Sequence, residues 1–148
     1  MLRIGVLGAA RITRDALIRP ASEVDDVEVV AIAARDADRA AEAARKHGIP
    51  NVHDSYQALL ADESIDAVYI PLPNGLHGRW TVAAIEAGKH VLCEKPFTAN
   101  ADEARAVAKV ADASGLVVAE AHHSTHHPQT KRAAEIVRQG ILGELESA

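Results

Sequence analysis

The sequence has a single cysteine, Cys93, and no apolar run of the length that a membrane helix needs. One thiol excludes an intramolecular disulfide and is typical of proteins kept in a reducing compartment. A spanning helix needs roughly 18 consecutive apolar residues, and no charged leader with an apolar segment precedes the first expected strand. We therefore expect a cytoplasmic protein without a membrane partner.

Aromatic residues and basic charge are also scarce. Only 3% of the 148 residues are aromatic, so the core must consist mainly of Ala, Val, Ile and Leu, which suits helices packed on strands. The net charge is −5 and no concentrated basic face is visible, which argues against a nucleic-acid partner, because phosphate contacts need clustered Lys and Arg. The 48% apolar content indicates a globular chain, and small anionic ligands are compatible with this composition.

What the sequence does contain is a repeated alternation of apolar strands and helices. The strand candidates are continuous apolar runs, which indicates burial on both faces of a parallel sheet. Capping signals mark the helices between them: Asp36 and Gly48 bound one helix, and Asn100 with Glu103 form a reciprocal cap on another. The pattern predicts an α/β fold with a doubly wound parallel sheet, the Rossmann fold, in which ligands bind beyond the carboxyl ends of the strands.

The expected strands are residues 1–7, 27–33, 65–73, 90–94 and 116–120, with a short one around Val52. The expected helices are residues 12–22, ending near Pro20, and residues 37–47, 56–62, 76–88, 101–115 and 128–140.

The first strand-to-helix turn, "GAARIT" from Gly8 to Thr13, partly matches a dinucleotide-binding fingerprint. That fingerprint needs glycine at the tight turn, glycine where the backbone meets the pyrophosphate, and a small residue where helix and strand cross. Gly8 meets the first requirement, whereas Ala10 adds a methyl group at the second and Thr13 is bulky at the third. The turn still opens a helix, whose free N–H groups attract an anion. The alternative is an ordinary strand-to-helix turn.

The end of the second expected strand indicates which dinucleotide binds. NAD sites usually present a carboxylate there to the ribose hydroxyls, whereas an arginine accommodates the additional phosphate of NADP. This chain has Ala33 and Ala34 followed by Arg35, with Arg39 one helical turn further on, and Asp36 is explained as a helix N-cap. NADP is therefore favoured over NAD. The alternative is that Arg35 is a solvated loop residue.

The loop "YIPLPNGLH", residues 69–77, follows the next expected strand at the same edge of the sheet. Pro71 and Pro73 stiffen this loop, and Asn74 offers an amide to a polar ligand. An ordinary turn would look similar, so the loop alone does not identify a site.

The stretch "CEKP" places Glu94 and Lys95 side by side at the end of a buried strand. A partly buried lysine exchanges protons or, while charged, polarises an alcohol or carbonyl oxygen, and Glu94 is suited to accept hydrogen bonds from a ribose. The following proline makes the Lys95–Pro96 bond a candidate cis peptide. The alternative is a surface ion pair of little energy.

The order of the motifs along the chain resembles that of the Gfo/Idh/MocA oxidoreductases. These motifs are "GAARI", "AARD", "PLPNGLH", "AGKHVLCEKPFTAN", "GLVVAEA" and "HPQ" with "GILGEL". The resemblance covers essentially the whole chain, and the Glu-Lys-Pro tripeptide is its most specific piece. "AARD" and "PLPNGLH" are most similar to NADP-dependent dihydrodiol and xylose dehydrogenases. The resemblance implies hydride transfer between a nicotinamide cofactor, NADP or NAD, and a sugar, polyol or related hydroxyl or carbonyl substrate.

The resemblance also implies residue roles. Lys95 is the expected catalytic residue, near the nicotinamide and the reacting hydroxyl, and Glu94 and Asn74 are expected at the nicotinamide ribose. The pyrophosphate is expected on residues 8–12, and the adenosine phosphate on Arg35. The complete set of expected cofactor contacts is Gly8, Ala10, Arg11, Ile12, Arg35, Leu72, Pro73, Asn74, His77, Glu94 and Lys95, with His77 in the cofactor-side loop.

Members of this family continue into a second domain, which supplies a catalytic histidine, most substrate contacts and usually the oligomer interface. We expect residues 1–121 to be the NAD(P)-binding domain, and residues 122–148 a crossover, a helix and the start of a truncated second domain, entering a strand at 141–148. The chain is then expected to bind cofactor without efficient turnover, and the intact enzyme is a candidate homo-oligomer. The alternative is a non-catalytic NADP-sensing or interaction module.

Four histidines, His122, His123, His126 and His127, stand where the family tends to have aromatic residues and an arginine. In a helix they would form two i, i+4 pairs, a spacing that binds zinc or nickel. No cysteine or carboxylate completes a site within the cluster, so we expect no metal and interpret the segment as a solvated loop or crossover.

Overall fold

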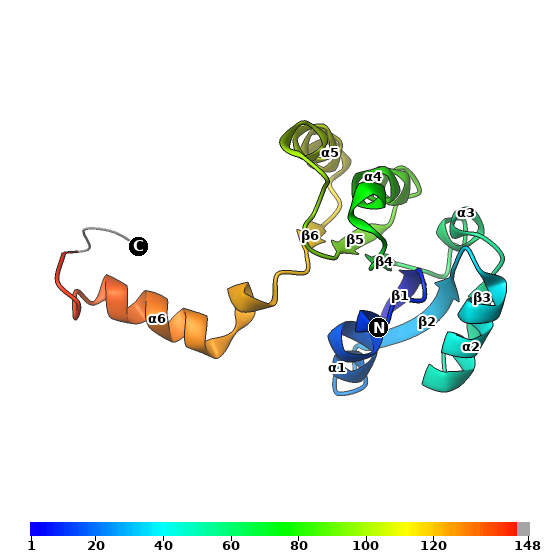
Figure 1. The fold of residues 1–148 in the computed structure, drawn as a ribbon, viewed down its shortest axis with the longest axis horizontal. Coiled ribbons are helices and arrows are strands. Elements are labelled where there is room, and N and C mark those ends of the chain that lie inside the picture. Colours follow the sequence, from blue (N-terminus) through cyan, green and yellow to red (C-terminus); the bar gives the residue numbers. More distant parts are fainter. Residues whose placement is uncertain (145–148) are drawn as a thin grey trace.

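The computed structural model describes residues 1–144 and builds them around a parallel sheet in the order β3-β2-β1-β4-β5-β6 (Figure 1). The chain winds outward from β1 to β3, returns to the centre at β4, and winds outward in the other direction. The direction reverses between β1 and β4, which is the place where doubly wound folds bind ligands. The predicted Rossmann fold is confirmed. The strands are β1 (Leu2–Leu7), β2 (Val27–Ala33), β3 (Asn51–His53), β4 (Ala67–Ile70), β5 (His90–Cys93) and β6 (Val118–Glu120).

The helices cover both faces of this sheet, with α1 and α2 on one face and α3, α4 and α5 on the other (Figure 1). This division follows from right-handed crossovers that run in opposite directions from the centre of the sheet. The helical elements are η1 (Arg14–Ile18), α1 (Arg19–Ala21), α2 (Ala37–His47), α3 (Tyr56–Leu60), η2 (Asn74–Leu76), α4 (His77–Glu86), α5 (Ala101–Ser114), η3 (His123–His126) and α6 (Pro128–Arg138).

Local capping signals account for the bounds of α2 and α5. The Asp36 carboxylate accepts a backbone N–H of the first turn of α2, and Gly48 ends that helix with a φ of 70°. Asn100 Oδ1 accepts from Glu103 N at 2.9 Å. The return bond differs from the expected reciprocal cap, because Glu103 Oε2 accepts from Ala99 N at 2.7 Å, one residue before the cap.

The helix that follows the first turn is irregular. It runs from Ile12 to Ala21, and its middle, η1, is a π-helical turn. Pro20 lies inside the last helical turn, close to the predicted end. Such π turns are rare and are frequently found at functional sites, and this one follows the turn at Gly8.

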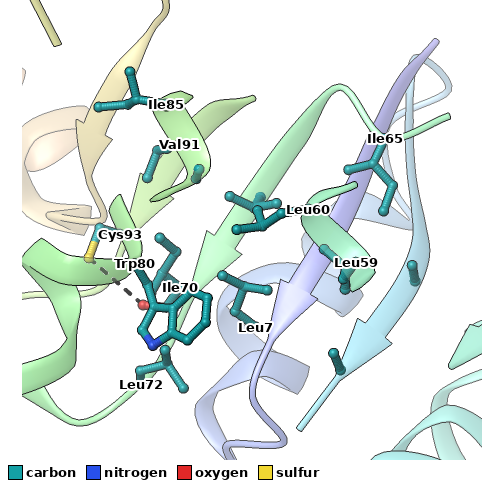
Figure 2. Close-up of a cluster of buried hydrophobic side chains, with 14 of the residues drawn as sticks. Leu7, Leu59, Leu60, Ile65, Ile70, Leu72, Trp80, Ile85, Val91 and Cys93 are labelled. Atoms are coloured by element: carbon teal, nitrogen blue, oxygen red, sulfur yellow. Dashed lines mark hydrogen bonds between the residues drawn. The ribbon is translucent and has the colours of Figure 1, made fainter. Parts of the chain in front are cut away.

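Two apolar layers pack against the sheet. On one face Leu7, Ile70 and Cys93, from three neighbouring strands, pack with Leu59 of α3 and Trp80 of α4 (Figure 2). The Cys93 thiol lies 3.9 Å from the carbonyl oxygen of Ile70, the contact dashed in Figure 2. Burial raises the pKa of Cys93 to about 12, so this thiol belongs to the core.

The opposite layer, beneath η1 and α2, contains a buried tyrosine. Val6, Ile32 and Tyr69 pack there with Leu17 and Ala44. All four residues of β4 are buried, which confirms the expected burial on both faces for a central strand. The same expectation is wrong for β6, whose residues are half-buried or exposed, because β6 is an edge strand.

The segment after β6 leaves the sheet. Helix α6 lies apart from the strands (Figure 1) and has no buried residue. The strand entry expected at 141–148 is not seen in residues 141–144, which form turns and a bend, and its remainder lies outside the described residues. Within residues 1–144 no helix combines the length and the apolar character needed to cross a membrane.

Candidate nucleotide-binding site

The carboxyl ends of the central strands bring the predicted site residues to one edge of the sheet. Val6 pairs with Tyr69, and Tyr69 pairs with Leu92, so these residues form one row across β1, β4 and β5. Side chains alternate along a strand, and the next row on the same face is therefore Gly8, Pro71 and Glu94. The glycine turn and the Glu-Lys-Pro stretch consequently lie two strands apart at the same edge.

A cavity of about 650 Å³ opens at this edge, between the loops that follow β1, β2, β3 and β4. Five of the predicted cofactor contacts line it: Gly8, Ala10, Arg35, Leu72 and Pro73. The other lining residues are Ala9, Ala34, Asp36, Arg39, Asp54, Ser55, Tyr56, Gln57, Pro71 and Leu76. Sequence reasoning did not find the contribution of residues 54–57, because the short strand before them carries no motif.

The turn at Gly8 passes close under the loop after β4. Gly8 has a φ of +115°, a conformation that side chains rarely adopt, and its N–H donates to the carbonyl of Ala33 at 2.7 Å. A Cβ at this position would lie 2.9 Å from Leu72 Cδ2. The glycine therefore lets the backbone reach the cavity wall. Thr13 is buried at the crossing of helix and sheet, so its bulk is accommodated in the core.

Two arginines give the β2 side of the cavity a positive charge. Arg35 and Arg39 are both exposed, and Arg39 Nη2 donates to the carbonyl of Ala9 at 3.0 Å, which ties α2 to the glycine turn. Asp36 is used as the cap of α2, as expected. Arg35 has no carboxylate partner within residues 1–144, so its guanidinium is available to an anion in the cavity.

The adjacent Glu94 and Lys95 do not form the ion pair that their order in the sequence suggested. Glu94 is buried and its Oε1 accepts from the Tyr69 hydroxyl at 2.7 Å, while its Oε2 accepts from the backbone N–H of Lys95 at 3.2 Å. The Lys95 side chain is exposed, and within residues 1–144 no salt bridge joins it to Glu94. The Lys95–Pro96 bond is cis, as predicted.

Tyr69 was not predicted as part of the site. Burial, reinforced by the hydrogen bond to Glu94, raises the pKa of the Tyr69 phenol well above its usual range. The signal that could have revealed it is a tyrosine inside an otherwise aliphatic buried strand, one strand away from a glutamate at the carboxyl edge.

The loop position expected for His77 is corrected by the structure. His77 is the first residue of α4 and is 1% exposed. Its Nε2 lies 2.6 Å from the carbonyl oxygen of Leu72, and its Nδ1 lies 2.7 Å from that of Pro96. The imidazole ring thus links the loop after β4 to the loop after β5. It does not line the cavity, because both of its nitrogens face backbone carbonyls.

The other predicted contacts, Glu94 and Lys95 included, are not among the residues that line the cavity. Asn74 is exposed in η2, and Ile12 is 46% exposed at the start of the first helix. Arg11 lines a second hollow of about 400 Å³ between η1 and α2, next to the first cavity and on the other side of Ala9 and Ala10.

The histidine cluster does not adopt the helical spacing that would pair its members. Only His123–His126 form a single 3₁₀ turn, and His127 is the cap of α6, accepting from Gln129 N at 3.1 Å. His122 Nδ1 lies 3.0 Å from the Ser124 hydroxyl. In the part of the chain that the structure describes, no three His, Cys, Asp or Glu side chains are arranged to hold a metal ion.

Comparison with known proteins agrees with this geometry. Residues 2–122 match the family model described as the GFO_IDH_MocA oxidoreductase family with an NAD-binding Rossmann fold. The chain is 51% identical over 136 residues to D-xylose 1-dehydrogenase (NADP(+)) 2 of Haloferax volcanii, covering 92% of this chain and 42% of that protein. It is 38% identical to trans-1,2-dihydrobenzene-1,2-diol dehydrogenase of Bos taurus, covering 97% of this chain and 43% of the relative.

Among solved structures, a 3-ketoreductase from Actinomadura kijaniata in complex with NADP and TDP-benzene superposes with a TM-score of 0.88 at 38% identity. The alignment covers 97% of this chain and 44% of the reductase. The chain thus spans less than half the length of the relatives that it matches.

Proposed function

Because the chain belongs to the Gfo/Idh/MocA oxidoreductase family, we propose that it binds NADP, in preference to NAD, at the carboxyl edge of its sheet. The observation that carries this proposal is the cavity between the glycine turn and Arg35, at the point where the strand order reverses. The end of β2 offers Ala34 and Arg35 to the ligand, and Asp36, the next residue in the sequence, is engaged as a helix cap.

The residues present fit such a cofactor. A cavity of about 650 Å³ lies within the size range of nucleotide and drug-like ligand sites. The backbone N–H groups of the turn at Gly8 would face the pyrophosphate, and the guanidinium groups of Arg35 and Arg39 would face the adenosine phosphate. Leu72 and Tyr56 supply apolar walls of the kind that adenine prefers.

When bound, the nicotinamide of NADP supplies hydride transfer. Lys95 is the proposed catalytic residue, because its exposed ammonium follows the strand that ends beside the cavity edge and is suited to donate to an alcohol or carbonyl oxygen. Glu94 and Asn74 are proposed to bind the nicotinamide ribose. His77 is proposed to support these loops from below, since its ring bonds to their backbones.

The named relatives are a D-xylose dehydrogenase, a dihydrobenzenediol dehydrogenase and a 3-ketoreductase, so we propose a sugar, polyol or related hydroxyl or carbonyl substrate. We propose residues 1–121 as the cofactor domain and 122–148 as the connection to a substrate domain, with a homo-oligomeric intact enzyme. The lone buried thiol fits a cytoplasmic location.

Titration of this chain with NADPH and NADH, followed by nicotinamide fluorescence, tests the cofactor. Replacing Arg35→Ala should weaken NADPH binding by about tenfold or more and change NADH binding by less than about twofold, because only NADPH carries the additional phosphate. Arg45→Ala, on the exposed part of α2 and outside the cavity, is the matched control. Absence of binding at about 1 mM, or tighter NADH than NADPH binding, contradicts the proposal.

Catalysis is tested in the full-length enzyme. Lys95→Met should lower turnover at least about tenfold, equivalent to about 1.4 kcal/mol of barrier, while NADPH binding persists. An unchanged rate would remove Lys95 from its role. NADP reduction with a panel of sugars and polyols separates an enzyme from a sensing module, which would bind cofactor without reducing it.

A further inference from the structure

The buried hydroxyl of Tyr69 in β4 has one protein partner within the described residues, the carboxylate of Glu94. The tyrosine side chain is 0% exposed and belongs to the layer beneath η1 and α2. Its register partner on β5 is Leu92, and Glu94 lies two residues further along, on the same face. The ring therefore extends along the sheet toward the carboxyl edge, and its hydroxyl meets Glu94 Oε1 at 2.7 Å.

This hydrogen bond largely determines where the Glu94 carboxylate sits. Glu94 is 7% exposed, and no Lys, Arg or His side chain forms a salt bridge with it in residues 1–144. Its Oε2 accepts from the N–H of Lys95, a donor that moves with the same loop. Tyr69, anchored in a central strand, is thus the donor that fixes this carboxylate relative to the sheet and to Gly8.

The phenol is also a permanent donor. Burial, the hydrogen bond to Glu94 and the negative charge of Glu94 all raise the pKa of Tyr69, so the hydroxyl keeps its proton throughout the physiological range. Because the Tyr69 hydroxyl donates its proton to Oε1, the Glu94 carboxylate acts there as an acceptor and has further lone pairs with which to accept from a ligand.

We propose that Tyr69 is a positioning residue for cofactor binding, which orients Glu94 toward the nicotinamide ribose. This inference rests on the proposed function, because it requires NADP at the carboxyl edge of the sheet. It assigns Tyr69 a role on the nicotinamide half of the cofactor only. The adenosine half would lie against Arg35 and the loop after β3, which line the cavity, whereas Tyr69 and Glu94 are not among its lining residues.

The test compares two ligands on matched variants of this chain. NADPH contains both halves of the cofactor, whereas adenosine 2′,5′-bisphosphate contains only the adenosine half with its phosphates. Tyr69→Phe should weaken NADPH binding by about tenfold and change binding of the bisphosphate by less than about twofold. Thr81→Val, which removes a buried hydroxyl of α4 on the opposite face of the sheet, should change neither affinity.

A double-mutant cycle separates positioning from a general loss of stability. In a Glu94→Gln background, Tyr69→Phe should weaken NADPH binding by less than about twofold, because its effect passes through the carboxylate. Fluorine NMR of the chain containing 3-fluorotyrosine needs no substitution: the Tyr69 resonance should shift with NADPH and stay unchanged with the bisphosphate.

The outcomes are distinguishable. If Tyr69→Phe binds NADPH and the bisphosphate as tightly as the unmodified chain does, the role of Tyr69 is overturned and the proposed function stands. The same holds if Tyr69→Phe weakens NADPH binding equally in the unmodified chain and in the Glu94→Gln background. Absence of binding of either ligand to the unmodified chain at about 1 mM would overturn the proposed function and this inference with it.

Discussion

Replacing Gly8→Ala should destabilise the protein by about 2 to 4 kcal/mol. Gly8 has a φ of +115°, and a side-chain-bearing residue in such a sparsely populated conformation costs about 1 to 3 kcal/mol. The new methyl group would also lie 2.9 Å from Leu72 Cδ2. Moving the tip of this flexible side chain adds about 1 kcal/mol, at the low end of overpacking costs.

Thermal unfolding followed by circular dichroism measures this change. For a chain of this size each kcal/mol lowers the midpoint by about 2 to 4 °C, so Gly8→Ala should lower it by roughly 4 to 16 °C. Gly48→Ala is the matched control, because Gly48 also has a positive φ, +70°, with no atom within 4 Å of a Cβ. Its cost is the backbone conformation alone, about 1 kcal/mol, or roughly 3 °C.

The contribution of the Leu72 contact is separable. In a Leu72→Ala background, the cost of Gly8→Ala should fall by about 1 kcal/mol, because the methyl group then has room. Midpoints of Gly8→Ala and Gly48→Ala that agree within about 1 °C would refute the reasoning, since the tight approach of the turn to the loop after β4 would then have no energetic consequence.

Three further predictions concern groups in the core. In a Tyr56→Phe variant Tyr69 is the one tyrosine left, and a spectrophotometric titration of the folded chain to about pH 11 should show no phenolate absorbance, because the pKa of Tyr69 is raised. The stability that this raised pKa contributes is fully present below about pH 10 and is lost as the pH rises further. Phenolate absorbance from the folded variant in this range would contradict the prediction. The Cys93 thiol is buried and its pKa is raised to about 12. At about pH 8 it should therefore react with a thiol reagent only as fast as the chain unfolds, and rapid labelling under native conditions would contradict this. Gly78→Ala would place a Cβ 2.5 Å from the Glu103 carboxyl group and displace the Glu103 side chain from its hydrogen bond with the backbone N–H of Ala99. The free energy of unfolding, measured by urea titration, should fall by about 1 kcal/mol. In a Glu103→Ala background the same change should be neutral or stabilising, because alanine favours a helix more than glycine does.

Where the folding signal is local, the sequence sufficed to predict the elements. Strand β2 and helix α2 were predicted to the residue, because a continuous apolar run, the cap Asp36 and the terminating Gly48 all lie within the elements that they define. The π turn in η1 and the exposure of β6 depend on what packs against these segments, and no local pattern encodes that.

The same distinction applies to the site. Parallel strands align their carboxyl ends, so the fold alone brings Gly8, Arg35 and Glu94 to one edge, as predicted. Side-chain partners could not be predicted in this way. Glu94 and Lys95 are neighbours in the sequence but point in different directions, whereas Tyr69 is 25 residues away and forms the hydrogen bond. His77 faces two backbone carbonyls whose positions depend on two separate loops.

The resulting arrangement of Glu94 is itself an argument for a ligand at this edge. A carboxylate that is 7% exposed and has no cationic partner within residues 1–144 loses hydration free energy that two hydrogen bonds only partly restore. For stability alone, a glutamine would accept the same Tyr69 proton without the charge. A ligand hydroxyl that donates to the remaining lone pairs would complete the shell, and Glu94→Gln should then raise the thermal midpoint of the free chain while it weakens NADPH binding. Loss of both stability and affinity would instead make the charge a structural requirement of the loop.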